Sequence, residues 1–433
     1  MKQYFDFAKH GTSYRTEIRA GIATFLTMAY IIVVNPAILE GAGLPREASI
    51  TATIISAAFG TLLMGVYAKR PFAIAPYMGE NAFIVFTVVK GMGFPWQTAL
   101  GAIFLAGVAF TLLTVFRIRS WLANALPMSL KHSFAIGIGL FLAFIGLNQI
   151  GVVAIGVPGA PVALGKLNEP TTLLALTGFV LTAWLLAKRV TGALIIGILA
   201  TTTLSIALGI TALPTGIVSM PPSLAPILGQ LDIAGALTLK ALPVVVIVFV
   251  MAFVDTIGTL IGLSARAGLL DEKGNLPDIE KPMLADALAN MFAPVVGTTT
   301  TGAFIESAVG IEEGGRTGFT ALVVAALFLL SLAFAPLFTA IPAHASGVAL
   351  VSIGLLMVGP IATLAVDDAT EWIPAVLTIV LMSFTFNIGV GMTAGLVLHP
   401  LLKLLTGRGR EVPVALWLLA AMSLAFYLVY PYH

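Results

Sequence analysis

The chain lacks cysteine altogether, and it has few charged residues for its length of 433. Without cysteine it forms no disulfide bond and uses no thiolate as a nucleophile or metal ligand. Charged residues make up 10% of the chain, whereas a soluble globular protein carries about 25%. The composition therefore excludes an ordinary soluble protein of this length.

The sequence also lacks the motifs of several enzyme and pump classes. There is no GxxxxGK[ST] motif, so we do not expect nucleotide-driven transport by this chain. No Ser/His/Asp constellation indicates catalysis, and we expect neither an enzyme, a metal site nor a nucleic-acid partner. The five histidines are scattered and form no HxxxH-type metal pair: His10, His132, His344, His399 and His433.

What the chain has in abundance is apolar sequence. Hydrophobic residues make up 59% of it, and the mean hydropathy is +1.04. The length leaves room for about 12–15 membrane-crossing helices. The first apolar run, at 17–38, continues past the length of a signal peptide and predicts a first span. We expect a multi-pass protein of the inner or plasma membrane.

The placement of Lys and Arg predicts the topology, because cytoplasmic loops carry an excess of both. With a cytoplasmic N-terminus and alternating spans, 18 of the 22 fall on the inner side, including Arg117, Arg119 and Lys273. Only Arg46, Lys90, Lys166 and Lys240 fall outside. The alternation is clear up to about residue 365, and the crossing order of 371–433 stays open.

Three apolar runs, at 79–90, 282–293 and 305–314, are too short for a full crossing of about 20 residues. Two lie in regions of similar design, RPFAIAPYMGENAFIVF at 70–86 and VVGTTTTGAFIESAVGIEEGGRTG at 295–318. Each has an extended or threonine-rich piece followed by a polar residue that opens a short helix. Broken helices in corresponding halves are typical of transporter binding sites and of inverted repeats.

Isolated acids within these apolar segments are the strongest candidates for a site. A carboxylate at mid-membrane costs about 2.5–3.5 kcal/mol and is usually functional. Asp255 and Glu306 are such residues, although each could instead serve only as a structural hydrogen-bond acceptor or helix cap. Thr259 lies one turn after Asp255, and Gly258 and Gly262 predict a face for close helix packing.

The Gly79-Glu80-Asn81 turn contributes a third acid and an amide. Asn81 donates and accepts hydrogen bonds, which suits a heteroaromatic ligand. Glu80 could point into the site or toward the outer loop. Flat ligands also stack on aromatic rings, for which the candidates are Tyr30, Phe83 and Phe304, although any single aromatic residue in such a chain is more often part of the core.

Other polar groups have simpler interpretations. Glu312, Glu313 and Arg316 predict an ion-pair cluster at the inner face. Asp367, Asp368 and Glu371 are typical of a solvated loop, and Arg117, Arg119 and Trp121 of an interfacial anchor.

Four stretches resemble the nucleobase:cation symporter-2 superfamily, and most closely its adenine/guanine/hypoxanthine permease branch. They are GTSYRTEIRAGIATFLTMAYIIVVNPAIL, APYMGENAFIVF, VDTIGTL and IESAVGIEEGGRTG. The resemblance covers about residues 5–410. It implies an all-α membrane protein of fourteen segments in two inverted repeats of seven. Segments 3 and 10 would each carry a short strand and a half-helix, the two strands pairing antiparallel.

The resemblance also implies a core domain and a gate domain that each combine two parts of the chain. The core would hold 1–118 and 236–341, and the gate 119–235 and 342–433. Family members are similar in forming homodimers and importing their substrate with protons.

Matched position by position, Asp255 and Glu306 correspond to the family's base-binding acids, and Asn81 to the asparagine of the purine branch. Thr259 stands where the uracil branch has histidine, which argues against uracil, and Glu80 replaces a more usual apolar residue. The expected substrate-binding set is Glu306, Asp255, Asn81, Thr259, Phe304, Ile305, Gly79 and Thr300. The expected proton-coupling set is Asp255, Glu306 and Glu80.

The sequence thus predicts a proton-coupled importer of purine nucleobases, with no cofactor other than the coupling ion. The alternatives are a xanthine, uracil or other small-solute carrier on the same fold, a passive channel, or a non-transporting receptor. The preferred purine, the proton-carrying acid and the choice of H⁺ or Na⁺ stay open.

Overall fold

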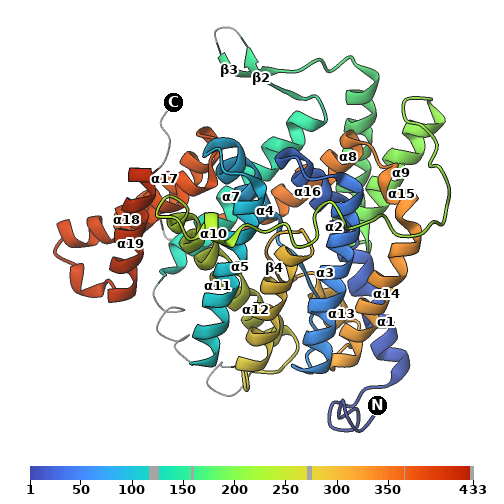
Figure 1. Cartoon of the computed structure of the whole chain (residues 1–433), viewed down its shortest axis with the longest axis horizontal. Helices are drawn as coiled ribbons and strands as arrows, with labels where there is room; N and C mark the ends of the chain where they lie inside the picture. The colour runs from blue at the N-terminus through green and yellow to red at the C-terminus, as the bar shows by residue number, and fades with distance from the viewer. Residues whose placement is uncertain (117–125, 158–159, 271–275, 365, 430–433) are drawn as a thin grey trace.

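A computed structural model describes residues 1–116, 126–157, 160–270, 276–364 and 366–429 (Figure 1). Arg117, Arg119, Trp121, Lys273 and the 118/119 domain boundary lie outside these ranges. Within them, nine helical segments are long and apolar enough to cross a membrane. The chain is a multi-pass membrane protein. The count of fourteen segments and the inverted repeat remain predictions.

Most of the nine candidate spans are single helices. They are α3 (Arg46–Val66), α5 (Trp96–Val115), α7 (Met128–Gln149), α8 (Pro170–Ala187), α11 (Leu242–Arg266) and α18 (Ile388–Leu405). The other three join shorter pieces: α1 (Tyr14–Met28) with α2 (Ile31–Leu39) and η1 (Glu40–Ala42), α14 (Gly318–Ser331) with η3 (Leu332–Phe334) and α15 (Ala335–Thr339), and α16 (Ala343–Met357) with η4 (Gly359–Thr363).

Three further apolar helices fall below that length: α9 (Ala193–Ala207), α17 (Ala369–Phe384) and α19 (Val414–Val429). A strand pair, β2 (Val153–Val157) with β3 (Ala160–Leu164), projects beyond the helices at the top of Figure 1. Shorter or more polar helices include α10 (Ile233–Ala236), α12 (Glu280–Val295) and η5 (Gly409–Glu411).

The helices pack in two sets that are discontinuous in sequence. In one set α3 packs against α14 and α12, and α5 packs against α12 and α11. In the other, α7 packs against α16 and α17, and α18 packs against α17 and α19. The division of the chain into a core domain and a gate domain remains a prediction.

Both broken elements form short strands that pair with each other. β1 (Ile74–Pro76) runs antiparallel to β4 (Thr301–Ala303), with Ile74 opposite Ala303 and Pro76 opposite Thr301. All six residues are buried. Strand pairing satisfies backbone groups that lipid cannot bind, which is why extended backbone survives at this depth. The predicted pair of short antiparallel strands is therefore confirmed.

Each of these strands leads into a short helix. β1 is followed by α4 (Met78–Ala82), which continues as a π-helical stretch over Phe83–Gly91. β4 is followed by α13 (Ser307–Glu312). π-helical turns are rare and occur often at functional sites.

The connection between α9 and α10 has no helix or strand of its own. It runs over residues 208–232 and crosses the front of the molecule in light and yellow green (Figure 1). We call residues 208–232 the strap.

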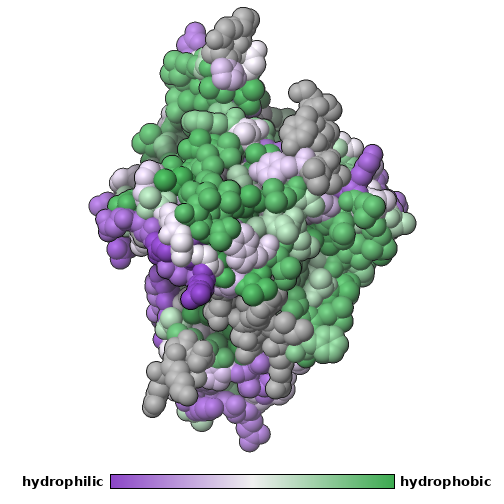
Figure 2. Space-filling model, turned by 90° about the vertical axis from the view of Figure 1, so that its left-hand side faces the viewer, coloured by the Kyte–Doolittle hydropathy of each residue, from purple (hydrophilic) through white to green (hydrophobic). Residues whose placement is uncertain are grey.

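The outer surface is mostly apolar, as a lipid-facing surface requires. Figure 2 shows hydrophobic residues over much of the α17–α19 side, with hydrophilic residues gathered toward the lower end and the left edge. Phe384, Leu405 and Val180 are each at least 67% exposed. Large apolar side chains at such exposure are unusual in water-soluble monomers when they are contiguous.

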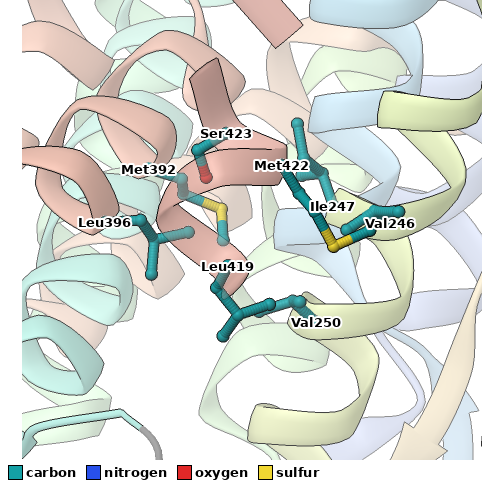
Figure 3. A pocket seen from close by; sticks show the side chains of 8 residues that line it. All are labelled: Val246, Ile247, Val250, Met392, Leu396, Leu419, Met422 and Ser423. Atoms are coloured by element: carbon teal, nitrogen blue, oxygen red, sulfur yellow. The ribbon is translucent and has the colours of Figure 1, made fainter. Parts of the chain in front are cut away.

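A small apolar pocket lies between α11 on one side and α18 and α19 on the other. Figure 3 shows its side chains approaching from both sides, including two methionines. Methionine adapts to irregular gaps because its side chain is unbranched and flexible. The residues that line it are Val246, Ile247, Val250, Met392, Leu396, Leu419, Met422 and Ser423.

Candidate functional site

Glu306 lies between β4 and α13, where the backbone turns from strand to helix. Its Oε1 accepts a hydrogen bond of 2.5 Å from the hydroxyl of Tyr30. Tyr30 is fully buried at the break between α1 and α2, whereas Glu306 is half-buried. The tyrosine hydroxyl therefore orients the carboxylate but occupies only one of its acceptor positions, so that others are left for a ligand. Tyr30 acts here through its hydroxyl rather than as a stacking ring.

Asp255 and Thr259 are half-buried on one face of α11. α11 contacts β4, α13 and α4, so this face lies beside both broken elements. Gly258 and Gly262 share the face, and a Cβ added at either would meet nothing within 4 Å. The prediction that these glycines pack closely against another helix is therefore wrong, because they border open space.

Glu80 is fully buried on α4, where the Thr300 side chain interacts with its carboxylate without reaching standard hydrogen-bond geometry. It interacts electrostatically with Asp255 and with Asp286. The sequence left open whether Glu80 points into the site or toward the outer loop. In the structure it points into the site, toward Asp255 and Asp286.

Asp286 is a carboxylate that the sequence analysis missed. It is fully buried on α12, and its Oδ2 accepts a hydrogen bond from the Thr256 hydroxyl next to Asp255. A lone acid inside the short apolar run 282–293 was the signal that could have revealed it. Three acids thus converge from α4, α11 and α12. Among the described residues there is no group of three or more His, Cys, Asp or Glu side chains suited to a metal ion.

Asn81 belongs to a buried network of amides and threonines. Its Oδ1 accepts a hydrogen bond from Thr299, and its Nδ2 donates to Asn35 Oδ1. Asn35 in turn donates to Thr298 at 3.0 Å and to Thr53 at 2.7 Å. The structure therefore uses both polar atoms of Asn81 to connect α4 with α2 and the threonine tract, and one Nδ2 hydrogen remains.

The other predicted site residues divide into buried and exposed. The Phe304 and Tyr77 rings are stacked at 9° with centroids 6.2 Å apart, and Tyr77 donates to Ala303 O at 3.1 Å. Thr300 is buried, and its hydroxyl interacts with the Glu80 carboxylate without reaching standard hydrogen-bond geometry. Ile305 is 65% exposed.

Two predicted positions lie against other helices. A Cβ added to Gly79 would come within 2.6 Å of Ile138 Cγ2 on α7, so Gly79 provides a close approach between α4 and α7. Phe83 is fully buried, and a Cβ on Gly389 of α18 would lie 2.8 Å from its ring. Phe83 is a packing residue between the broken element and α18.

The ion pairs predicted around Glu312 and Glu313 are present, with different partners from those predicted. Glu312 pairs with Arg266 at 2.7 Å, and Glu313 with Arg19 at 2.9 Å. Arg316 donates instead to the backbone carbonyls of Ile311 and Gly315. Long-range partners replace the expected local cluster because the N-terminal half of α1 and the C-terminal end of α11 lie beside α13.

A second polar cluster joins the ends of α7, α17 and α18, and it corrects the prediction that Asp368 and Glu371 lie in a solvated loop. Lys403, only 4% exposed, pairs with Glu371 at 2.9 Å and Glu411 at 3.1 Å. Arg408 pairs with Asp368 at 2.6 Å. Hydrogen bonds from Thr370 and Arg408 hold the pKa of Asp368 below its usual range. Part of this cluster lines a cavity of about 160 Å³.

The comparisons with known proteins agree with this geometry. A model of a permease family matches residues 15–394. The chain is 40% identical over 412 residues to the adenine permease AdeP of Escherichia coli (strain K12), covering 95% of this chain and 92% of AdeP. It is 36% identical over 438 residues to the guanine/hypoxanthine permease PbuG of Bacillus subtilis (strain 168), covering 98% of this chain and 99% of PbuG.

Among solved structures, the transmembrane domain of the cyanobacterial bicarbonate transporter BicA superposes with a TM-score of 0.66 at 16% identity. It covers 88% of this chain and 96% of that domain, and shows a shared fold. The family match and the full-length relatives together establish that this chain belongs to the nucleobase:cation symporter-2 family, in the branch whose members are named adenine and guanine/hypoxanthine permeases.

Proposed function

We propose that the protein imports purine nucleobases, with adenine, guanine and hypoxanthine as the candidates, and couples their uptake to protons. The observation that carries the proposal is the half-buried Glu306 carboxylate, which Tyr30 holds at 2.5 Å where β4 leads into α13. Further support comes from relatives named for adenine and for guanine/hypoxanthine. The membrane would be the inner or plasma membrane, with a cytoplasmic N-terminus.

Recognition would rest on acceptors that match the N–H groups of a purine. A carboxylate accepts two N–H bonds side by side, and such charge-assisted bonds are about twice as strong as neutral ones. In this proposal Glu306 and Asp255 accept from the base, and Thr259 borders it on the α11 face. Asn81 acts mainly by holding the threonine tract, with Gly79, Thr300, Phe304 and Ile305 shaping the surroundings.

Proton coupling would use the convergence of Glu80, Asp255 and Asp286. Three carboxylates that share one low-dielectric region repel one another when all are charged, so at least one holds a proton. Glu80 is fully buried, and only the Thr300 hydroxyl, short of standard hydrogen-bond geometry, offsets the cost of a charge on it. We propose that Glu80 and Asp255 share the coupling proton, and that Glu306 binds substrate.

Transport would proceed by alternating access, with the helices around β1 and β4 sliding as a core domain against a gate domain that includes α7 and α16–α19. The methionine-containing pocket between α11 and α18 supports such a sliding contact, because adaptable side chains tolerate displacement. We propose two inverted repeats of seven segments and a homodimer. In this scheme the chain has no catalytic role.

The direct test is uptake of radiolabelled adenine, guanine, hypoxanthine, xanthine and uracil into a transport-deficient strain that expresses the protein. We expect saturable uptake of at least one of the first three, competition among purines, and loss of accumulation with a protonophore. Failure of every purine to compete would refute the purine proposal. Equilibration that is insensitive to a protonophore would instead indicate a passive channel.

A further inference from the structure

The strap is attached along its length to helices of the core set. Ser219 N donates to Ala333 O at 3.0 Å, and Thr51 Oγ1 donates to Pro222 O at 3.0 Å. At its end, Asp232 N donates to Gln97 O at 2.9 Å, and Asp232 Oδ2 accepts from Thr98 at 3.0 Å. These anchors lie on α3, η3 and the start of α5. A connection that only needed to span a distance would not require so many specific contacts.

Between these anchors, one strap side chain packs against the entry to the threonine tract. Ile227 is fully buried. Gly297, just before Thr298, has φ +89°, and a Cβ added there would lie 2.6 Å from Ile227 Cβ. Glycine is thus required at 297 both for its left-handed backbone and for this close approach. Ile227 occupies the space that a side chain at 297 would need.

The strap also caps the helix that precedes the threonine tract. The last carbonyls of a helix have no partner within it. Gly229 N donates to Val295 O at 2.7 Å, and so supplies a partner to the final residue of α12. Two strap residues therefore fix the point at which the chain leaves α12.

The next residues carry the candidate site. Thr298 and Thr299 bond to the Asn35 and Asn81 amides, and Thr301 begins β4, three residues before the Phe304-Ile305-Glu306 turn. Thr301 N is itself held by Asn290 Oδ1 at 2.9 Å. Because Gly297 is bonded directly to Thr298, a displacement of Gly297 also displaces the start of this tract.

We propose that Ile227 and Gly229 are positioning residues for the substrate site: the strap sets the geometry of the Thr298–Thr301 tract by capping α12 and packing over Gly297. The proposal rests on the proposed function for the identity of the substrate, and on contacts alone for the positioning role. Neither strap residue is placed in contact with the base.

The transport test compares Ile227→Ala and Ile227→Val with Met220→Ala, a strap residue that is 88% exposed. We expect KM for purine uptake to rise about threefold to tenfold in Ile227→Ala and less in Ile227→Val, because a loosened supporting contact misplaces the binding groups. Vmax per folded molecule should stay within about twofold, as should both parameters of Met220→Ala. If Ile227→Ala yields no folded protein, Ile227→Val is judged by the same criterion. Unchanged KM in the folded variants would overturn the proposal.

A second readout needs no substrate and uses the lack of native cysteine. Thr300→Cys places a single thiol in the tract at a buried position. We expect maleimide to label it at least about tenfold faster when Ile227→Ala is added, and at an unchanged rate when Met220→Ala is added. Equal labelling rates would refute the positioning role whatever the substrate is. Faster labelling without purine uptake by the wild type would refute only the proposed function.

Discussion

The Tyr30 hydroxyl donates to the Glu306 carboxylate across 2.5 Å, although the two residues stand 276 positions apart in the chain. Tyr30 lies at the break between α1 and α2, and Glu306 at the break between β4 and α13. One buried hydrogen bond thus joins two interruptions of helical backbone and sets the direction of the central acid. Four of the five predictions below test such contacts between distant segments.

Tyr30→Phe removes this donor while keeping the ring. Hydrogen bonds to charged groups contribute about 1.5–3 kcal/mol, so we expect KM for purine uptake to rise about tenfold or more. Tyr427→Phe, which loses a 2.9 Å bond to Val390 O away from the site, is the matched control. A lower KM in Tyr30→Phe would mean that the hydroxyl competes with the substrate instead of orienting the acid.

Glu306→Gln should abolish purine binding, because a neutral amide replaces one acceptor oxygen with a donor. Glu312→Gln should largely retain it, since Glu312 is paired with Arg266 at an exposed position. Both are compared by isothermal titration of the purified protein with the preferred purine. Equal losses in the two variants would show that the binding acid is misassigned.

Gly79→Ala tests the close approach of α4 to α7. The added methyl would meet Ile138 Cγ2 at 2.6 Å, and overpacking of this kind costs about 1–3 kcal/mol. We expect lower thermal stability and lower uptake, with partial recovery in the Gly79→Ala/Ile138→Ala double variant. If stability and uptake do not recover in the double variant, the loss in Gly79→Ala does not come from the contact with Ile138.

Lys403→Met tests the polar cluster at the ends of α7, α17 and α18. Removing the buried ammonium leaves Glu371 and Glu411 without their shared partner. Because both carboxylates are partly exposed, we expect a loss of about 3 kcal/mol, the lower end of the range for broken buried pairs. Thermal unfolding in detergent measures it, with the exposed Lys188→Met as control, and equal melting temperatures would contradict the prediction.

The same cluster predicts a pH dependence. Thr370 and Arg408 depress the pKa of Asp368 in the folded state, so the ionised carboxylate stabilises the fold above its unfolded pKa of about 3.9. This contribution is lost as the pH falls through the depressed folded pKa. Arg408→Ala should therefore lower the melting temperature by a similar amount from pH 8 to pH 5, and by less only below about pH 4. A penalty that disappears between pH 8 and pH 5 would require another titrating group.

The residues by themselves predicted the membrane class, the two broken elements, and the importance of Asp255 and Glu306, whereas the pairing of the two strands was implied by the family resemblance. These predictions rest on local chemistry. A long apolar run is stable only in lipid or in a protein core, and four threonines favour extended backbone. A lone carboxylate in such a run carries a desolvation cost, so it usually has a function.

Only the tertiary structure decided which side chains meet. Asp286 beside Thr256, Asn81 bonded to Thr299, and Ile227 packed over Gly297 are pairs brought together by helix packing. No local pattern encodes such a pair, because its partners belong to segments whose order in space is set by the burial of all the helices at once. For the same physical reason Glu312 pairs with Arg266 on α11 and Glu313 with Arg19 on α1, and neither pairs with Arg316, which is nearer in sequence.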